Sequence, residues 1–278
     1  MKLIASFLVI ILGAIGLFAQ SDLQKLVDTE HAFAQLAADK DTRTAFLANM
    51  SDDALIFNPD TTRAKPFWEG RTANKSLLSW APNYADISRN GILGYTTGNW
   101  EFRAKGKDDA PSAFGDFITL WLRQPDGKYK FVIDIGVGHP KPDRYSTEWS
   151  TSTPRKIEQK ATSKPTNDAE SEFYRLAAAK GVVNAYKRFA DENIRSYRED
   201  RLPFLGKKNV IKLLKADRAE YSFAKRSSSF RSDDISYNLN TYTKTQGGKV
   251  VEKGNFLQIW KFYSGRWHIV LDIFKPVP

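Results

Sequence analysis

The segment Glu30-His-Ala-Phe-Ala-Gln-Leu-Ala-Ala-Asp-Lys40 reappears 140 residues later as Glu170-Ser-Glu-Phe-Tyr-Arg-Leu-Ala-Ala-Ala-Lys180. Three further matches keep nearly the same offset: Gly115-Asp-Phe117 with Gly254-Asn-Phe256, Trp121 with Trp260, and Phe131-Val-Ile-Asp-Ile135 with Ile269-Val-Leu-Asp-Ile273. A repeat of this length is a duplicated domain and not a solenoid unit. The sequence therefore predicts two copies of one domain, over residues 22–140 and 167–278.

The stretch between the copies, residues 141–166, is rich in Lys, Pro, Ser and Thr and has almost no apolar side chains. Pro154 and Pro165 discourage a helix there. We expect this stretch to be a linker.

Within each copy, apolar residues first recur at helical spacing and then alternate with a period of two. Helices are expected at residues 23–38, 42–49, 71–80, 169–179, 182–190 and 207–215. Strands are expected at residues 92–102, 114–123, 130–137, 221–225, 235–245, 250–262 and 267–274. Helices followed by a run of antiparallel strands indicate an α+β fold.

The chain opens with a lysine and an apolar run from Leu3 to Phe18, followed by the small residue Ala19. This pattern is typical of a secretory signal peptide over residues 1–19. The alternative is an uncleaved membrane anchor, but the run is short for a span of about 20 residues. We expect cleavage after Ala19, an exported protein that is periplasmic or secreted, and no membrane span in the mature chain.

Composition excludes several kinds of chemistry. The 278 residues include no cysteine and three histidines. Disulfides, thiolate nucleophiles and cysteine-bearing zinc sites are therefore excluded. No glycine-rich phosphate-binding loop is present. We expect neither a metal site nor a cofactor.

Charge is distributed unevenly along a chain whose net charge is +10. Residues 20–140 carry 14 basic against 16 acidic side chains, whereas residues 168–278 carry 21 against 13. The basic half indicates either an anionic partner or a solvated surface that favours solubility. No nucleic-acid-binding motif is present, and we expect no nucleic-acid partner.

Three segments carry a resemblance to a known family: EHAFAQLAADKDTRTAFLANMSDDALIF, GYTTGNWEF and FGDFITLWLRQPDGKYKFVIDIG. The order and content of these segments resemble the nuclear transport factor 2-like superfamily, in particular its SnoaL-like bacterial branch of unassigned function. The resemblance implies two tandem cone-shaped domains, each with N-terminal helices packed on a strongly curved, mostly antiparallel sheet. It also implies that the two sheets pair within the chain, as family members pair in dimers. The fold hosts isomerases, dehydratases, cyclases and binding modules, so it does not assign a function.

Each copy places one aspartate in its last strand, Asp134 and Asp272. Alternation puts Asp134 on the face opposite to Phe131, Ile133 and Ile135. A carboxyl group among apolar neighbours has a raised pKa unless a cation or donors offset the loss of water. Asp134 is thus a candidate general acid or base, with Tyr95 or His139 as its partner. The alternative is a structural carboxylate bonded to an arginine or a backbone amide.

Aromatic residues are abundant in the segments that bound the predicted cones. Aromatic walls with a few polar tips are typical of pockets for small apolar molecules. The candidate ligand-binding residues are Trp68, Trp80, Tyr84, Trp100, Trp121, Tyr237, Trp260 and Asp272. The alternative is that these side chains simply fill the core.

Three functions remain open at this point. The first is an exported module that binds a small apolar or amphipathic ligand in a cone pocket. The second is an enzyme of the isomerase, dehydratase or cyclase type that uses Asp134. The third is a structural interaction protein in which side chains fill the cones.

Overall fold

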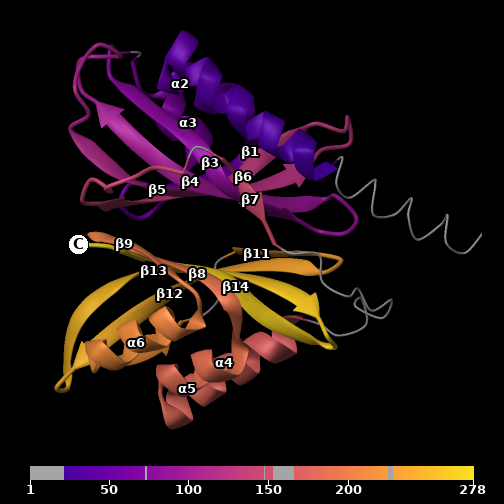
Figure 1. Ribbon diagram of the computed structural model, residues 1–278, viewed down its shortest axis with the longest axis vertical. Coiled ribbons are helices and arrows are strands. Elements are labelled where there is room, and N and C mark those ends of the chain that lie inside the picture. The colour runs from indigo at the N-terminus through magenta and orange to yellow at the C-terminus, as the bar shows by residue number, and fades with distance from the viewer. Residues whose placement is uncertain (1–21, 73, 147, 153–165, 225–227) are drawn as a thin grey trace, which may run out of the picture.

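The structure is a computed structural model that describes residues 22–72, 74–146, 148–152, 166–224 and 228–278. It contains two sheets of seven strands each. Figure 1 shows the sheets facing each other at the centre of the molecule, with the helices of each domain on the outer side. This confirms the predicted α+β fold with two domains. The predicted signal peptide, residues 1–19, lies outside the described residues.

Domain 1 begins with a helix described over residues 22–39. The elements that follow are α2 (Thr42–Asn49), β1 (Met50–Phe57), β2 (Thr61–Arg63), α3 (Ala64–Glu69), β3 (Leu77–Ile87), β4 (Leu93–Arg103), β5 (Ala113–Arg123), β6 (Tyr129–His139) and β7 (Ser150–Thr151). The strand order is β2-β1-β6-β5-β4-β3-β7. The β1–β6 and β3–β7 pairs are parallel, and the other pairs are antiparallel.

Domain 2 repeats this plan. Its elements are α4 (Thr166–Lys180), α5 (Val182–Phe189), β8 (Ala190–Arg198), β9 (Arg201–Leu205), α6 (Lys207–Asp217), β10 (Glu220–Phe223), β11 (Ser228–Ser232), β12 (Ile235–Gln246), β13 (Lys249–Tyr263) and β14 (Arg266–Pro276). The strand order is β10-β12-β13-β14-β8-β9, and β11 also pairs with β12. As β6 does with β1, β14 pairs in parallel with β8.

Local sequence explains most of these elements. The first helix buries one stripe of side chains at a spacing of three or four residues, Leu23, Leu26, Val27, Phe33 and Ala37. The predicted helix over residues 71–80 is wrong, because Leu77 to Trp80 begin β3, where Trp80 pairs with Trp100 of β4. Periodicity alone does not separate helix from strand in so short an apolar run.

Part of the predicted linker belongs to domain 1. Ser150 and Thr151 pair with β3 as strand β7, and Trp149 packs against the helix-facing core of domain 1. Trp149, an apolar residue in a polar stretch, therefore indicates where the chain after β6 still contacts domain 1. At the other end, α4 begins at Thr166.

Each sheet buries side chains on both faces. The face toward the helices forms one core in each domain, and we call these spaces cone 1 and cone 2. The opposite faces meet in a third core, the interdomain cluster. Its buried members are Leu93, Tyr95, Ile118, Leu120, Ile133, Ile135 and Val137 of domain 1, and Tyr197, Ile235, Tyr237, Leu239, Leu257, Ile259, Val270, Leu271 and Ile273 of domain 2. The two sheets thus pack face to face within one chain.

Both last strands carry a β-bulge at the same place. Leu120 pairs with Ile133 and Trp121 with Phe131, which leaves Val132 as the extra residue. Domain 2 repeats this at Val270. A bulge reverses the alternation locally. Phe131 therefore faces cone 1 while Ile133 faces the interdomain cluster, so the prediction that they share a face is wrong.

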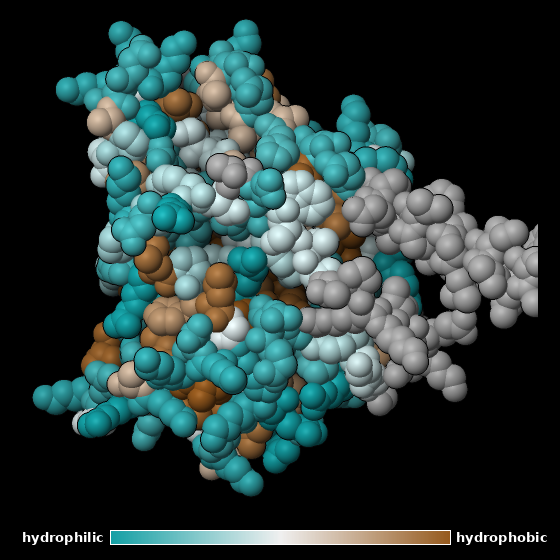
Figure 2. Space-filling view, viewed as in Figure 1, coloured by the Kyte–Doolittle hydropathy of each residue, from teal (hydrophilic) through white to brown (hydrophobic). Residues whose placement is uncertain are grey.

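Polar bonds join the domains around the interdomain cluster. Arg89 binds Asp233 through two nitrogens at 2.6 Å each. Lys261 Nζ lies 2.6 Å from Asp86 Oδ1. Figure 2 shows a mostly hydrophilic surface, on which hydrophobic side chains gather near the level where the domains meet and on domain 2.

Candidate functional site

Asp134 faces cone 1 from the middle of β6. Its Oδ2 accepts a hydrogen bond from Thr119 Oγ1 at 2.7 Å, and the side chain keeps partial contact with solvent. Burial raises the pKa of Asp134 to about 6, although the Thr119 hydrogen bond acts in the opposite direction. Asp134 lies on the face opposite to Ile133 and Ile135, as alternation predicts. Neither Arg103 nor Arg123 supplies a counter-charge, because they pair with Glu101 and Asp22.

A second carboxyl group, Glu30 of the first helix, lies in the same cone and is fully buried. It accepts hydrogen bonds from Trp80 Nε1 at 2.6 Å, Thr96 Oγ1 at 2.5 Å and Trp121 Nε1 at 3.2 Å. Burial raises the pKa of Glu30 to about 7, and the charge of Asp134 adds to the rise while the three hydrogen bonds oppose it. Two interacting carboxyl groups therefore change protonation near neutral pH inside domain 1.

Asp272 occupies the equivalent position in domain 2. Register establishes the equivalence, because Asp134 lies between Ile56 and Thr119, and Asp272 lies between Ser196 and Gln258. The surroundings of the two aspartates differ.

Asp272 is fully buried and fully bonded. It accepts from Tyr186 Oη at 2.6 Å and Ser196 Oγ at 2.7 Å, and it forms an ion pair with Arg198 Nη1 at 2.6 Å. These bonds make Asp272 a structural carboxylate, which was the alternative considered for Asp134.

Domain 1 lacks all three of these donors. Tyr186 corresponds to Phe46 at the constant offset of the repeat, Ser196 corresponds to Ile56 by register, and Arg198 corresponds to Asn58. Both copies therefore keep the aspartate, but only Asp272 of domain 2 has an arginine that neutralises its charge.

The structure does not bring the other two proposed catalytic residues to Asp134. Tyr95 packs in the interdomain cluster, on the opposite face of the sheet. His139 Nε2 lies 3.0 Å from Asp116 Oδ2, with both side chains almost fully buried. Burial alone would lower the pKa of His139, but the Asp116 hydrogen bond and charge outweigh it and raise the pKa. An odd separation of five residues already places His139 on the face opposite to Asp134.

The predicted aromatic ligand residues are divided among three places. Trp68, Trp80 and Trp121 pack in the core of cone 1, and Trp260 packs in the core of cone 2. Tyr84 and Tyr237 belong to the interdomain cluster. Aromatic rings therefore fill the depth of cone 1, as the contacts of Phe33 with Trp80, Trp121 and Phe131 show at ring-centre distances of 4.7–6.1 Å.

Trp100 is partly buried and belongs to none of these three clusters. Its indole lies over Gly115, where a Cβ would come within 2.3 Å of the ring. Its Nε1 also lies close to Gly136, the next residue on the face that carries Asp134. Trp100 and Asp134 are thus two partly buried side chains near each other on the cone 1 face of the sheet.

Glu30 is not among the candidate residues predicted from the sequence, although its position on the first helix indicates that it is unusual. Glu30 follows Leu26 and Val27 and precedes Phe33 on the buried stripe of the first helix. A carboxyl group at a buried position of an amphipathic helix is unusual. The repeat also keeps a glutamate at this position, Glu170.

Residues 22–72, 74–146, 148–152, 166–224 and 228–278 contain neither a metal-binding cluster nor a membrane-spanning helix. No group of three or more His, Cys, Asp or Glu side chains in these ranges has a geometry that could hold a metal ion. None of the helices described there is long and apolar enough to cross a membrane.

Comparisons with known proteins reach single domains only. No family profile and no curated protein matches the chain. Among solved structures, it is similar to a putative calcium/calmodulin-dependent protein kinase type II association domain from Thiobacillus denitrificans (17% identity, TM-score 0.35, 40% of this chain and 94% of that chain). It is also similar to a nuclear transport factor 2-like protein of unknown function from Shewanella oneidensis (13% identity, TM-score 0.34, 39% and 98%). A protein of unknown function with a cystatin-like fold from Nostoc punctiforme matches at 11% identity and a TM-score of 0.35, over 41% and 89%.

The Shewanella protein carries the name of the superfamily that the three sequence segments resemble. Identities and scores this low say nothing about function.

Proposed function

We propose that the chain is an exported two-domain binding protein, in which domain 1 holds a small apolar or amphipathic ligand at the Asp134 side of cone 1. Domain 2 serves as the fixed partner of domain 1. Trp100 offers the ligand an apolar surface, and Asp134 offers it a carboxyl group that exchanges a proton near pH 6. Protonated, this group donates a hydrogen bond to the ligand; ionised, it accepts one.

One observation carries this proposal, the difference between the two equivalent aspartates. Asp272 has three donors and no exposed surface, whereas Asp134 has one donor and keeps contact with solvent. Asp134 is only partly buried and has no arginine to neutralise it, so its carboxyl group can form a hydrogen bond with a ligand. The catalytic alternative loses its partners, since Tyr95 and His139 lie on the other face.

Replacing Asp134 with Asn should remove ligand capture and leave the fold intact, because the amide keeps the contact with Thr119 and introduces no charge. Purified wild-type and variant proteins are incubated with an extract of cellular small molecules and recovered, and retained compounds are identified by mass spectrometry. We expect at least one compound on the wild type that D134N does not retain. The control is Asp126→Asn in an exposed turn of domain 1. The same retained compounds on wild type and D134N would contradict the proposal.

The titration of Asp134 is a separate expected result. Carbon-13 NMR of the aspartate carboxyl groups should show a midpoint near pH 6 that disappears in D134N. A midpoint at or below the ordinary value for aspartate would show that a cation or further donors reach this group in solution.

Export is tested independently of binding. If residues 1–19 are a signal peptide, the intact mass of protein recovered from the periplasm or medium should correspond to a chain that begins at Gln20. A full-length mass in the membrane fraction would favour the anchor instead.

A further inference from the structure

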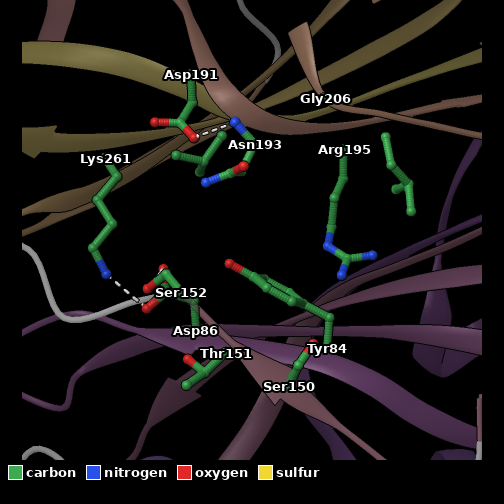
Figure 3. A pocket seen from close by; sticks show the side chains of 12 residues that line it. Tyr84, Asp86, Ser150, Thr151, Ser152, Asp191, Asn193, Arg195, Gly206 and Lys261 are labelled. Atoms are coloured by element: carbon green, nitrogen blue, oxygen red, sulfur yellow. Dashed lines mark hydrogen bonds and ion pairs between the residues drawn. The ribbon is translucent and has the colours of Figure 1, made fainter. Parts of the chain in front are cut away.

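A cleft of about 430 Å³ opens between the two domains. Domain 1 supplies Tyr84, Asp86 and strand β7, and domain 2 supplies Asp191, Asn193, Arg195 and Lys261. Figure 3 shows Arg195 and Tyr84 reaching toward each other from opposite domains, with Lys261 and Asp86 together at the other end of the cleft. The volume is in the range typical of small-molecule sites.

The two cations of the cleft are placed differently. Lys261 is neutralised by Asp86 at 2.6 Å. The guanidinium of Arg195 instead lies 4.0 Å above the centre of the Tyr84 ring, and it has no carboxylate partner within the described residues. Burial raises the pKa of Tyr197 in the interdomain cluster, and the nearby positive charge of Arg195 opposes this rise. The guanidinium is thus held in a fixed position at the cleft while its positive charge remains unmatched.

Arg195, Lys261 and Asp86 of the cleft each have an equivalent in the other domain, and that equivalent shows which side chain the fold can accept at the position. Register makes Arg195 equivalent to Leu55, since they pair with Leu271 and Ile133 at equivalent points of β14 and β6. Lys261 follows Trp260 as Leu122 follows Trp121, and Asp86 pairs with Tyr95 as Phe230 pairs with Tyr237. Leu55, Leu122 and Phe230 all pack against the interdomain cluster.

The same three positions of the fold are thus apolar at one place in the interface, as Leu55, Leu122 and Phe230. They are charged at the cleft, as Arg195, Lys261 and Asp86. Leucine is sufficient for packing at the first of these positions, because domain 1 uses it there. An arginine in that place gives up apolar contact and loses part of its hydration without an ion pair in return. Stacking on Tyr84 compensates part of this loss, but it supplies no negative charge, whereas a ligand of opposite charge would supply one.

We propose that the interdomain cleft binds a small organic anion, whose carboxylate or phosphate group is held by Arg195. The planar guanidinium presents paired N–H donors that match the geometry of either group. The Asn193 side chain and the hydroxyl of Thr151 are exposed at the same cleft and supply further donors. This site is independent of Asp134, because it lies on the other face of the sheets.

The test compares the wild type with Arg195→Leu, which installs the residue that domain 1 carries. Succinate and inorganic phosphate are titrated at constant ionic strength, with succinamide as the neutral analogue of succinate. Binding is followed by calorimetry and by the NMR signal of the Arg195 Nε–H group. We expect saturable binding of at least one anion to the wild type, none of succinamide, and a loss of affinity of about ten- to a hundredfold in R195L.

Two further variants separate charge from fold. Arg175→Leu on the outer, exposed face of α4 makes the same change away from the cleft and should bind like the wild type. Arg195→Lys keeps the charge and loses the planar fork, and it should bind with intermediate affinity. Equal binding by R195L and wild type, equal binding of succinamide and succinate, or no saturable binding of either anion to the wild type would each overturn the proposal. A result with D134N has no bearing on these outcomes.

Discussion

Replacing Arg198 with Asn should lower the free energy of unfolding by about 3–5 kcal/mol, the usual cost of breaking a buried ion pair from one side. Arg198 Nη1 lies 2.6 Å from Asp272, a side chain with no exposed surface. The guanidinium also lies 3.9 Å from the centre of the Phe274 ring. Asn58 is the residue that domain 1 carries at this position of the repeat. Urea denaturation at pH 7 measures the loss.

A second replacement identifies its cause. In Asp272→Asn/Arg198→Asn no buried charge is left unpaired, so the double variant should recover most of the stability that R198N loses. Arg103→Asn breaks a partly exposed pair with Glu101 and should cost less than about 1 kcal/mol. If R198N costs no more than R103N, or if D272N does not rescue it, the Asp272 carboxylate does not depend on Arg198.

The duplicated domains were predictable because the repeat is local in sequence and its offset is nearly constant. Alternation along the last strand also placed Asp134 toward the helices. The bulges at Val132 and Val270 were not predictable, because a bulge depends on the pairing partner and leaves no mark on the strand itself. Phe131 was consequently placed on the wrong face.

In the candidate site too, local sequence patterns predict the burial of a residue but not its bonding partners. Glu30 stood on a buried helical stripe that the sequence displays. The bond between Arg198 and Asp272 joins residues 74 positions apart, and nothing in either segment indicates it. Tyr95 was paired with Asp134 although the sequence gave no register between their strands, and only the sheet shows that they face different layers.

Differences between the copies are more informative about function than the matches that revealed the repeat. A matched position, such as Trp121 and Trp260, reports a shared need of the fold. Leu55 and Arg195 have the same place in the sheet, and Asn58 corresponds to Arg198 at the constant offset of the repeat. In each pair one copy shows what the fold accepts. The other residue therefore requires a separate explanation, which is neutralisation for Arg198 and a ligand for Arg195.

Glu30→Gln should stabilise the protein at pH 8 by about 2–3 kcal/mol and have little effect near pH 5. In the folded state burial raises the pKa of Glu30 from 4.5 to about 7, so the folded chain keeps a proton that the unfolded chain has released. Stability therefore falls as pH rises from about 4.5 to 7, by about 1.4 kcal/mol for each pH unit in that window. Glu30 is fully buried, so solvent does not screen this effect.

Glutamine removes the ionisation and keeps the shape. Its amide oxygen can accept from Trp80 Nε1, and its amide nitrogen can donate to the Thr96 hydroxyl, in place of the bonds that Glu30 makes at 2.6 and 2.5 Å. Trp121 Nε1 loses its 3.2 Å bond to Glu30 but keeps Thr96 Oγ1 as an acceptor at 2.9 Å. Free energies of unfolding measured in urea from pH 4.5 to 8.5 should give a flatter curve for E30Q than for the wild type. Asp126→Asn, at an exposed turn, should leave the slope unchanged. Parallel curves for E30Q and the wild type would mean that Glu30 is already ionised in the folded protein, and the coupling of its pKa to Asp134 would then have to be rejected as well.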